Sequence, residues 1–91
     1  VFPERDTLAA IYRFLYRIQQ QEGGIPYTAA ELTVQFGQQE QHVSFYTMCT
    51  GLRIFQELNL LHLDLEENNY YLPKVSARME LSSSPTFRRH H

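Results

Sequence analysis

Arginine and lysine side chains are the groups in this sequence that are best suited to binding chemistry. Arg13 and Arg17 lie four residues apart, which places them on one face of a helix. From residue 74 onward, four basic residues stand against a single acidic one, Glu80. Guanidinium groups engage carboxylates and phosphates through paired N–H donors. For Arg13 and Arg17 the alternative is an ordinary solvated helix face. The pattern predicts contact with an acidic peptide or a nucleic-acid backbone, through Arg13, Arg17, Lys74, Arg78, Arg88 and Arg89.

Catalytic and metal-binding patterns are missing from the sequence. The single cysteine, Cys49, falls in an apolar stripe, so we expect a buried and inert thiol rather than a nucleophile. The acidic residues do not have the spacing of metal ligands. No Gly-x-Ser-x-Gly, His-Glu-x-x-His or phosphate-binding glycine-rich motif occurs. We therefore expect no catalytic residue and no metal ligand, and we expect the chain not to be an enzyme by itself.

Apolar residues at helical spacing predict the first element that positions these side chains. A helix is expected from about Asp6 to Gln21, with Asp6 or Thr7 capping its start. Gly23-Gly24 should end it. The apolar face of this helix comprises Leu8, Ile11, Tyr12, Leu15 and Ile18.

Two further helices are expected after a short extended link at residues 25–27. The second helix opens with a capping box, in which Thr28 and Glu31 each bind a backbone N–H of the other, and it should end at Gly37. The third helix should span about residues 39–58. Gly51 in its middle predicts a close crossing with another helix, because glycine otherwise costs a helix about 1 kcal/mol relative to alanine.

An alternating pattern then predicts a β-hairpin. Leu61, Leu63 and Leu65 alternate with polar residues, as in a strand with one buried face. Residues 66–69 form the expected turn, and residues 70–72 form the returning strand.

This order of elements predicts an α+β fold of the winged-helix type, with a three-helix core and a C-terminal hairpin as the wing. The second and third helices would form a helix-turn-helix. We expect the winged-helix-like domain to span residues 1–81. A Ser/Pro break and a short basic tail would follow at residues 82–91, where Ser84 could cap a short helix that begins with Pro85.

Acidic residues lie on both surfaces that a winged helix usually presents to DNA. The expected start of the third helix, at residues 39–42, has no Lys or Arg and includes Glu40. Asp64, Glu66 and Glu67 surround the expected tip of the wing. The charges therefore favour a docking module, or an accessory contact to nucleic acid through the basic C-terminal stretch, over sequence-specific reading of a groove.

Overall composition indicates one small packed domain. The 91 residues are 43% hydrophobic and 13% aromatic, and the formal net charge of −2 disfavours a strongly basic nucleic-acid binder. No apolar run approaches the roughly 20 residues of a membrane span, so no membrane partner is expected. A lone cysteine and the lack of a leader predict a cytoplasmic location. The start at Val1 suggests a fragment or a processed chain, and His90-His91 is either native or part of a purification tag.

Three segments together resemble the C-terminal domain of RecJ, the single-stranded-DNA-specific exonuclease family of bacteria. Residues 48–61, with the step Phe55-Gln56-Glu57-Leu58, resemble the helix-to-strand passage of that domain. Pro3-Glu4-Arg5-Asp6, before an aromatic-rich helix, is similar to its opening. Residues 80–88 are similar to its ending.

The resemblance implies a parent enzyme that degrades single-stranded DNA from the 5′ end with Mn²⁺ or Mg²⁺, in DNA repair and recombination. The Asp-His-His motif of the family is missing, because His90-His91 follows Arg89 rather than an acid. The implied role is therefore a non-catalytic accessory domain beside the catalytic core of the parent chain. It would position single-stranded DNA or dock the acidic tail of single-stranded-DNA-binding protein. In the first case Tyr70, Tyr71 or Phe87 would offer a stacking face for bases; the alternative is that one of the two tyrosines belongs to the core and the other is half exposed. A winged-helix DNA-binding regulator and an interaction module unrelated to a nuclease are the alternatives.

Overall fold

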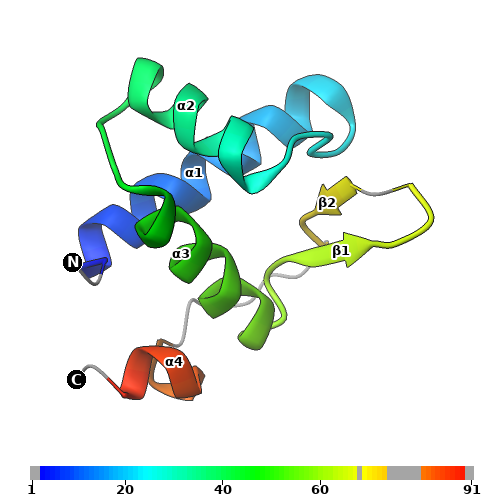
Figure 1. Cartoon of the computed structure of the whole chain (residues 1–91). Helices are drawn as coiled ribbons and strands as arrows, with labels where there is room; N and C mark the ends of the chain where they lie inside the picture. The colour runs from blue at the N-terminus through cyan, green and yellow to red at the C-terminus, as the bar shows by residue number, and fades with distance from the viewer. Residues whose placement is uncertain (1–2, 68, 74–80, 90–91) are drawn as a thin grey trace.

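Three main helices and one antiparallel hairpin make up most of the described part of the chain. The computed structural model describes residues 3–67, 69–73 and 81–89. This α+β arrangement has the predicted order of elements and is consistent with a winged-helix-like layout (Figure 1). In chain order the elements are α1 (Arg5–Glu22), α2 (Ala29–Gln39), α3 (Phe45–Glu57), β1 (His62–Asp64), β2 (Asn69–Tyr71), a 3₁₀ turn (Leu81–Ser83) and α4 (Pro85–Arg88).

The two ends of α1 differ in how well the sequence predicts them. The helix ends at Gly23 as predicted, and the φ of 75° at this residue lies in the left-handed region that glycine tolerates. The predicted cap at the start is wrong. Glu4 is the N-cap residue and its side chain makes no capping hydrogen bond, so Asp6 and Thr7 lie inside the helix.

The capping box at the start of α2 is confirmed, whereas the predicted end of this helix is wrong. Thr28 Oγ1 accepts from the Glu31 N–H at 3.2 Å, and Glu31 Oε1 accepts from the Thr28 N–H at 2.9 Å. The helix continues past Gly37 to Gln39. A Cβ at Gly37 would lie 3.0 Å from His42 Nδ1, so this glycine makes room for the following loop instead of ending the helix.

The third helix begins several residues later than predicted and ends where the sequence indicates. Ser44 is its N-cap, and the Ser44 hydroxyl accepts from the Thr47 N–H at 3.0 Å. At the other end, Asn59 has a positive φ of 60°, and the Leu60 N–H donates to the Phe55 carbonyl at 2.8 Å. This Schellman-type ending confirms that Asn59 helps to close the helix.

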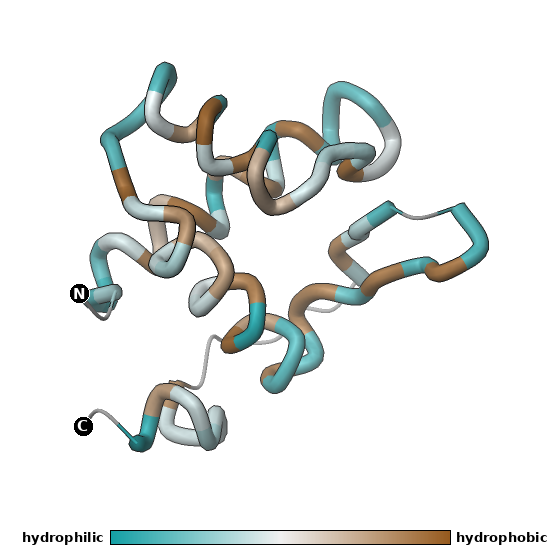
Figure 2. Tube along the Cα trace, viewed as in Figure 1, coloured by the Kyte–Doolittle hydropathy of each residue, from teal (hydrophilic) through white to brown (hydrophobic). Residues whose placement is uncertain are grey.

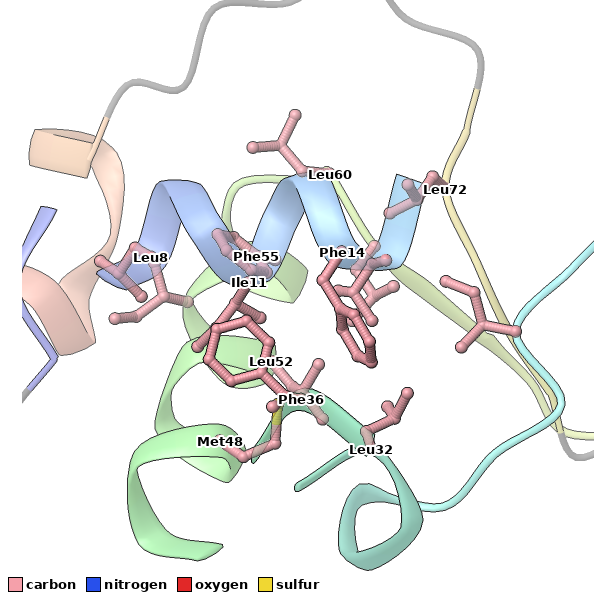
Figure 3. Packing of buried hydrophobic residues seen from close by; sticks show 14 of the residues in the cluster. Leu8, Ile11, Phe14, Leu32, Phe36, Met48, Leu52, Phe55, Leu60 and Leu72 are labelled. Carbon is pink, nitrogen blue, oxygen red and sulfur yellow. The ribbon is translucent and has the colours of Figure 1, made fainter. Parts of the chain in front are cut away.

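Side chains from all three main helices meet in one hydrophobic core (Figure 3). Phe14 of α1 meets Phe36 of α2 edge-on, with 5.3 Å between ring centroids. Tyr12 and Phe55 form a similar pair between α1 and α3, at 5.5 Å. Hydrophobic and hydrophilic residues accordingly alternate along each helix (Figure 2). Fully buried members of the core include Leu8, Ile11, Phe14, Leu15, Ile25, Leu32, Phe36, Met48, Ile54 and Phe55.

Backbone and glutamine hydrogen bonds hold the hairpin against the end of α1. β1 and β2 pair in antiparallel register, with Leu63 opposite Tyr70. The predicted extended link contributes Ile25, which exchanges two backbone hydrogen bonds with Tyr70 at 2.9 and 3.1 Å. Gln19 of α1 binds both backbone groups of Leu72, donating to the carbonyl at 2.9 Å and accepting from the N–H at 2.5 Å. This bridging role of Gln19 between α1 and the hairpin was not predicted from the sequence.

The predicted buried face of the hairpin is wrong beyond its first leucine. Leu61 is buried, but Leu63 is 37% exposed and Leu65 is 82% exposed. β1 has only three residues, and the hairpin extends away from the helices (Figure 1). The alternation of the sequence is therefore real, but no helix covers the outer part of the apolar face.

The C-terminal segment packs on the rest of the domain. Leu81 and Phe87 belong to the same core as the three main helices. The guanidinium of Arg5, in the first turn of α1, lies 5.6 Å from the centre of the Phe87 ring. Ser84 caps α4 as predicted and accepts from the Phe87 N–H at 3.1 Å, with Pro85 in the first helical turn.

The close helix crossing predicted at Gly51 is confirmed. A Cβ built on Gly51 would lie 3.3 Å from Ile11 Cδ1 and 3.5 Å from Leu8 Cδ2. These contacts leave room for alanine only if the Ile11 methyl shifts slightly, and they leave none for a larger side chain. Glycine at this position therefore lets α1 and α3 approach each other.

We predict that Gly51→Leu lowers the free energy of unfolding by about 1–3 kcal/mol, the usual cost of overpacking. Gly51→Ala should stay within about 1 kcal/mol of wild type, because better helix propensity offsets the tight contact. Urea unfolding measures both, and Gln38→Leu, at an exposed helix position, is the control. A Gly51→Leu protein as stable as wild type would contradict the crossing.

Candidate nucleic-acid interface

The basic residues singled out in the sequence fall in different parts of the structure. Arg13 and Arg17 are exposed on α1, and Arg17 Nη2 forms an ion pair with Glu40 Oε2 at 2.8 Å. Arg88 and Arg89 are exposed at the end of α4. The other two, Lys74 and Arg78, lie outside the described residues.

The arginines on α1 and on α4 do not form one surface. Arg5 lies against Phe87 of α4, and Arg17 follows twelve residues later on α1. At 1.5 Å per residue, this separation is about 18 Å along the helix axis. The structure therefore divides the described candidates into a pair on α1, partly neutralised by Glu40, and a pair on α4.

The acidic start predicted for the third helix is wrong. Glu40 is the C-cap residue of α2, and its N–H donates to the Phe36 carbonyl at 2.8 Å. The glutamine-rich segment around Glu40 contains no helix-breaking residue, so no residue type marks the loop between the two helices. The predicted start of the third helix therefore fell too close to the end of α2. The actual start of α3 is Ser44-Phe45-Tyr46, which is aromatic and uncharged. The electrostatic objection to nucleic acid at this helix is therefore removed.

The solvent-facing side of α3 combines an exposed aromatic ring with a guanidinium group. Phe45 and Tyr46 are each 55% exposed, although both are large and hydrophobic. Arg53 is also exposed and follows Tyr46 by seven residues, two helical turns, so the two lie on nearly the same face. Neither Tyr46 nor Arg53 was predicted as a site residue from the sequence. Both lie outside the set of buried residues of α3, and their helical spacing could have identified them as a shared exposed face.

A shallow groove lies between this face of α3 and α4. Its volume is about 250 Å³. It brings the predicted Arg89 next to Arg53, which comes from a different helix. The groove is lined by Tyr46, Cys49, Thr50, Arg53, Thr86 and Arg89.

A carboxylate at the end of α3 holds α4 in this position. Glu57 Oε1 accepts from the Ser84 hydroxyl at 2.5 Å and from the Thr86 N–H at 3.1 Å. Glu57 Oε2 accepts from the Thr86 hydroxyl at 2.6 Å. Burial by itself would raise the pKa of Glu57, but these hydrogen bonds and the nearby Arg53 outweigh it and lower the pKa below its ordinary value. The carboxylate therefore stays charged while it binds the start of α4.

Cys49 forms part of the groove wall and remains a neutral thiol at physiological pH. Its side chain is partly exposed rather than buried as predicted. Desolvation raises the pKa of the thiol, and the neighbouring Arg53 only partly opposes this. Because the thiolate is the reactive form, this environment does not activate Cys49.

The two tyrosines of the hairpin differ in exposure, because only Tyr71, at 43%, keeps an exposed ring, so stacking of a base on it stays a prediction. Tyr70 is half-buried, and Tyr71 stacks on His62 with 5.4 Å between ring centroids. Phe87, the third predicted stacking residue, is buried in the core, so its ring cannot take a base. At the hairpin tip, Asp64 Oδ1 accepts from the Glu66 N–H at 3.0 Å and so builds the turn.

The described residues show no metal centre and no membrane-spanning helix, and the chain has no match among known proteins. Within residues 3–67, 69–73 and 81–89, no group of three or more His, Cys, Asp or Glu side chains could hold a metal ion. None of the described helices combines the length and the apolar character needed to cross a membrane. No protein-family model, curated protein or solved structure matches the chain.

We predict that Glu57→Gln destabilises the domain by about 1.5–3 kcal/mol at neutral pH, as is usual for hydrogen bonds to a charged group. Because the folded-state pKa is lowered, this stabilisation is present above the ordinary value of 4.5 and is lost as the pH falls through the folded-state pKa. The difference between wild type and Glu57→Gln should therefore shrink in acid. Urea unfolding across pH measures it.

The exposed Glu66→Gln variant is the matched control and should show no such loss. Equal stability of wild type and Glu57→Gln at neutral pH would mean that the carboxylate does not hold α4 in place.

Proposed function

We propose that this chain is a winged-helix accessory domain of a RecJ-type exonuclease and that it contacts single-stranded DNA without doing chemistry itself. Two features support the winged-helix assignment. The helices and the hairpin follow in the expected order, and Ile25, in the extended link after α1, pairs with Tyr70 in an isolated antiparallel bridge. The assignment to a nuclease is supported by the resemblance of three segments to the RecJ C-terminal domain. The Mn²⁺ or Mg²⁺ of the parent enzyme would belong to its catalytic core, and the enzyme would act in the cytoplasm.

The observation that carries the proposal is the pairing of exposed aromatic and arginine side chains on α3. Proteins that bind single strands combine positive charge for the backbone with aromatic rings on which bases stack. Tyr46 and Arg53 meet this description on one helix face, with Arg89 beside them. Bases in a duplex have their faces covered, so an exposed ring is of more use to a single strand.

Charge at the hairpin also favours single strands over duplex DNA. A duplex lying along α3 would bring its second contact to the wing of a winged helix. Here the tip carries Asp64, Glu66 and Glu67, which repel phosphates. A flexible single strand can follow α3 and α4 without approaching this tip.

Docking of a protein partner is the second candidate, and the exposed hairpin leucines favour it. Leu63 and Leu65 present apolar surface outside the core, where the catalytic core of a parent chain could cover it. The acidic tail of single-stranded-DNA-binding protein would instead bind at basic residues, of which Arg88 and Arg89 are the exposed pair on α4.

We predict salt-sensitive binding of the domain to fluorescent single-stranded oligonucleotides, measured by anisotropy. The slope of log K against log salt should be about −0.7 or more negative, because −0.7 is the value for one phosphate contact to a single strand. Duplex of the same sequence should bind more weakly. A flat salt response, or no binding at low salt, would contradict DNA contact.

In that case the acidic tail peptide and the separate catalytic core would be titrated next. Loss of peptide binding on charge reversal of Arg88 and Arg89 would establish the docking function.

A further inference from the structure

We propose that the groove between α3 and α4 is a subsite for one nucleotide of a single strand. In this subsite Arg53 and Arg89 bind the phosphate, and the ring of Tyr46 stacks on the base. The inference rests on the proposed function and gives it a location. Of the basic residues singled out in the sequence, only Arg89 belongs to this subsite, and Arg53 of α3 is its second guanidinium.

The two guanidinium groups are available for a ligand. Among the described residues, no hydrogen bond and no ion pair joins Arg53 or Arg89 to another side chain, whereas Arg17 is already paired. The charge of Glu57 interacts with that of Arg53, but both oxygens of Glu57 accept hydrogen bonds from Ser84 or Thr86. The N–H donors of both arginines can therefore turn to a phosphate, which accepts such paired bonds well.

The hydroxyl groups of the groove leave the phosphate contact to the arginines. Thr86 donates its hydroxyl proton to Glu57, so it has no proton left to donate to an anion. Thr50 is almost completely buried. Removal of one arginine should therefore have a measurable effect, because neither threonine can replace it as a donor to the phosphate.

The shape and lining of the groove favour a nucleotide over a peptide. A volume of about 250 Å³ lies below the range of about 300–1,000 Å³ that holds drug-sized ligands, so one small group fits. Among the described residues, no Leu, Ile, Val, Met or Phe lines the groove, so this lining offers no pocket for an apolar peptide side chain. A base needs only an exposed ring, and Tyr46, which is exposed and lines the groove, provides one.

The test compares three variants of the 91-residue chain that have the same net charge, together with two variants of Tyr46 that leave the charge unchanged. Arg53→Gln and Arg89→Gln each remove one positive charge from the groove. Gln20→Glu changes the net charge equally at an exposed position near the far end of α1. Tyr46→Leu removes the ring, and Tyr46→Phe keeps it. All five substitutions are at exposed positions, and urea unfolding confirms that each variant folds.

Affinity for a short fluorescent oligothymidylate is measured over a salt series. Each arginine variant should weaken binding roughly three- to tenfold and make the salt slope less negative. Tyr46→Leu should weaken binding about fivefold or more with the slope unchanged, and Tyr46→Phe should bind like wild type. Gln20→Glu should also bind nearly like wild type.

The outcomes separate this inference from the proposed function. If wild type binds the oligonucleotide but the groove variants bind equally well, the subsite is wrong and the proposed function stands. If Gln20→Glu weakens binding as much as Arg53→Gln, binding follows overall charge and the subsite is again wrong. If wild type binds only an acidic peptide, and the groove variants abolish that binding, the proposed nucleotide is the wrong occupant. If wild type binds no single strand at low salt, the proposed function fails as well.

Discussion

The hydrogen bonds of one carboxylate, Glu57, hold α4 beside α3 and so form the groove between the two helices. Glu57 is the last residue of α3, and it accepts three hydrogen bonds from Ser84 and Thr86 at the start of α4. A helix of only four residues is not stable by itself, so its position must come from tertiary contacts. Phe87 provides the apolar contact, and Glu57 fixes the orientation. Arg89 reaches the side of α3 because of this arrangement.

Much of the fold could be predicted from local chemistry in the sequence. Gly23, the Thr28–Glu31 capping box, Asn59 and Ser84 all act where their residue types indicate, because each signal depends only on nearby backbone groups. The start of α3 could not be found in this way, because the residues before it tolerate helix and only tertiary packing requires the loop. The exposure of Leu65 also depends on packing, since alternation does not tell how far the helices extend over a hairpin.

The candidate site was only partly predictable, for a related reason. Sequence counting gives equal weight to every basic residue, although Arg17 is neutralised by Glu40 from a different helix. Arg89 was included in the prediction, but its neighbour Arg53 was not, because the two are far apart in the chain and meet only through α4. Tyr46 was missed because an aromatic residue at the start of an apolar helix is normally assigned to the core. Partners that come from separate elements become visible only in the folded structure.

The central claim is that a single strand meets the domain at the face shared by α3 and α4. Mapping by NMR, with oligothymidylate added to the isotope-labelled chain, tests this most directly because it locates the contact without any mutation. The account predicts that the largest shifts occur at the backbone of Tyr46 and at the guanidinium groups of Arg53 and Arg89, with little change at the hairpin tip. Shifts centred on Arg13 and Arg17, or on the hairpin, would contradict it.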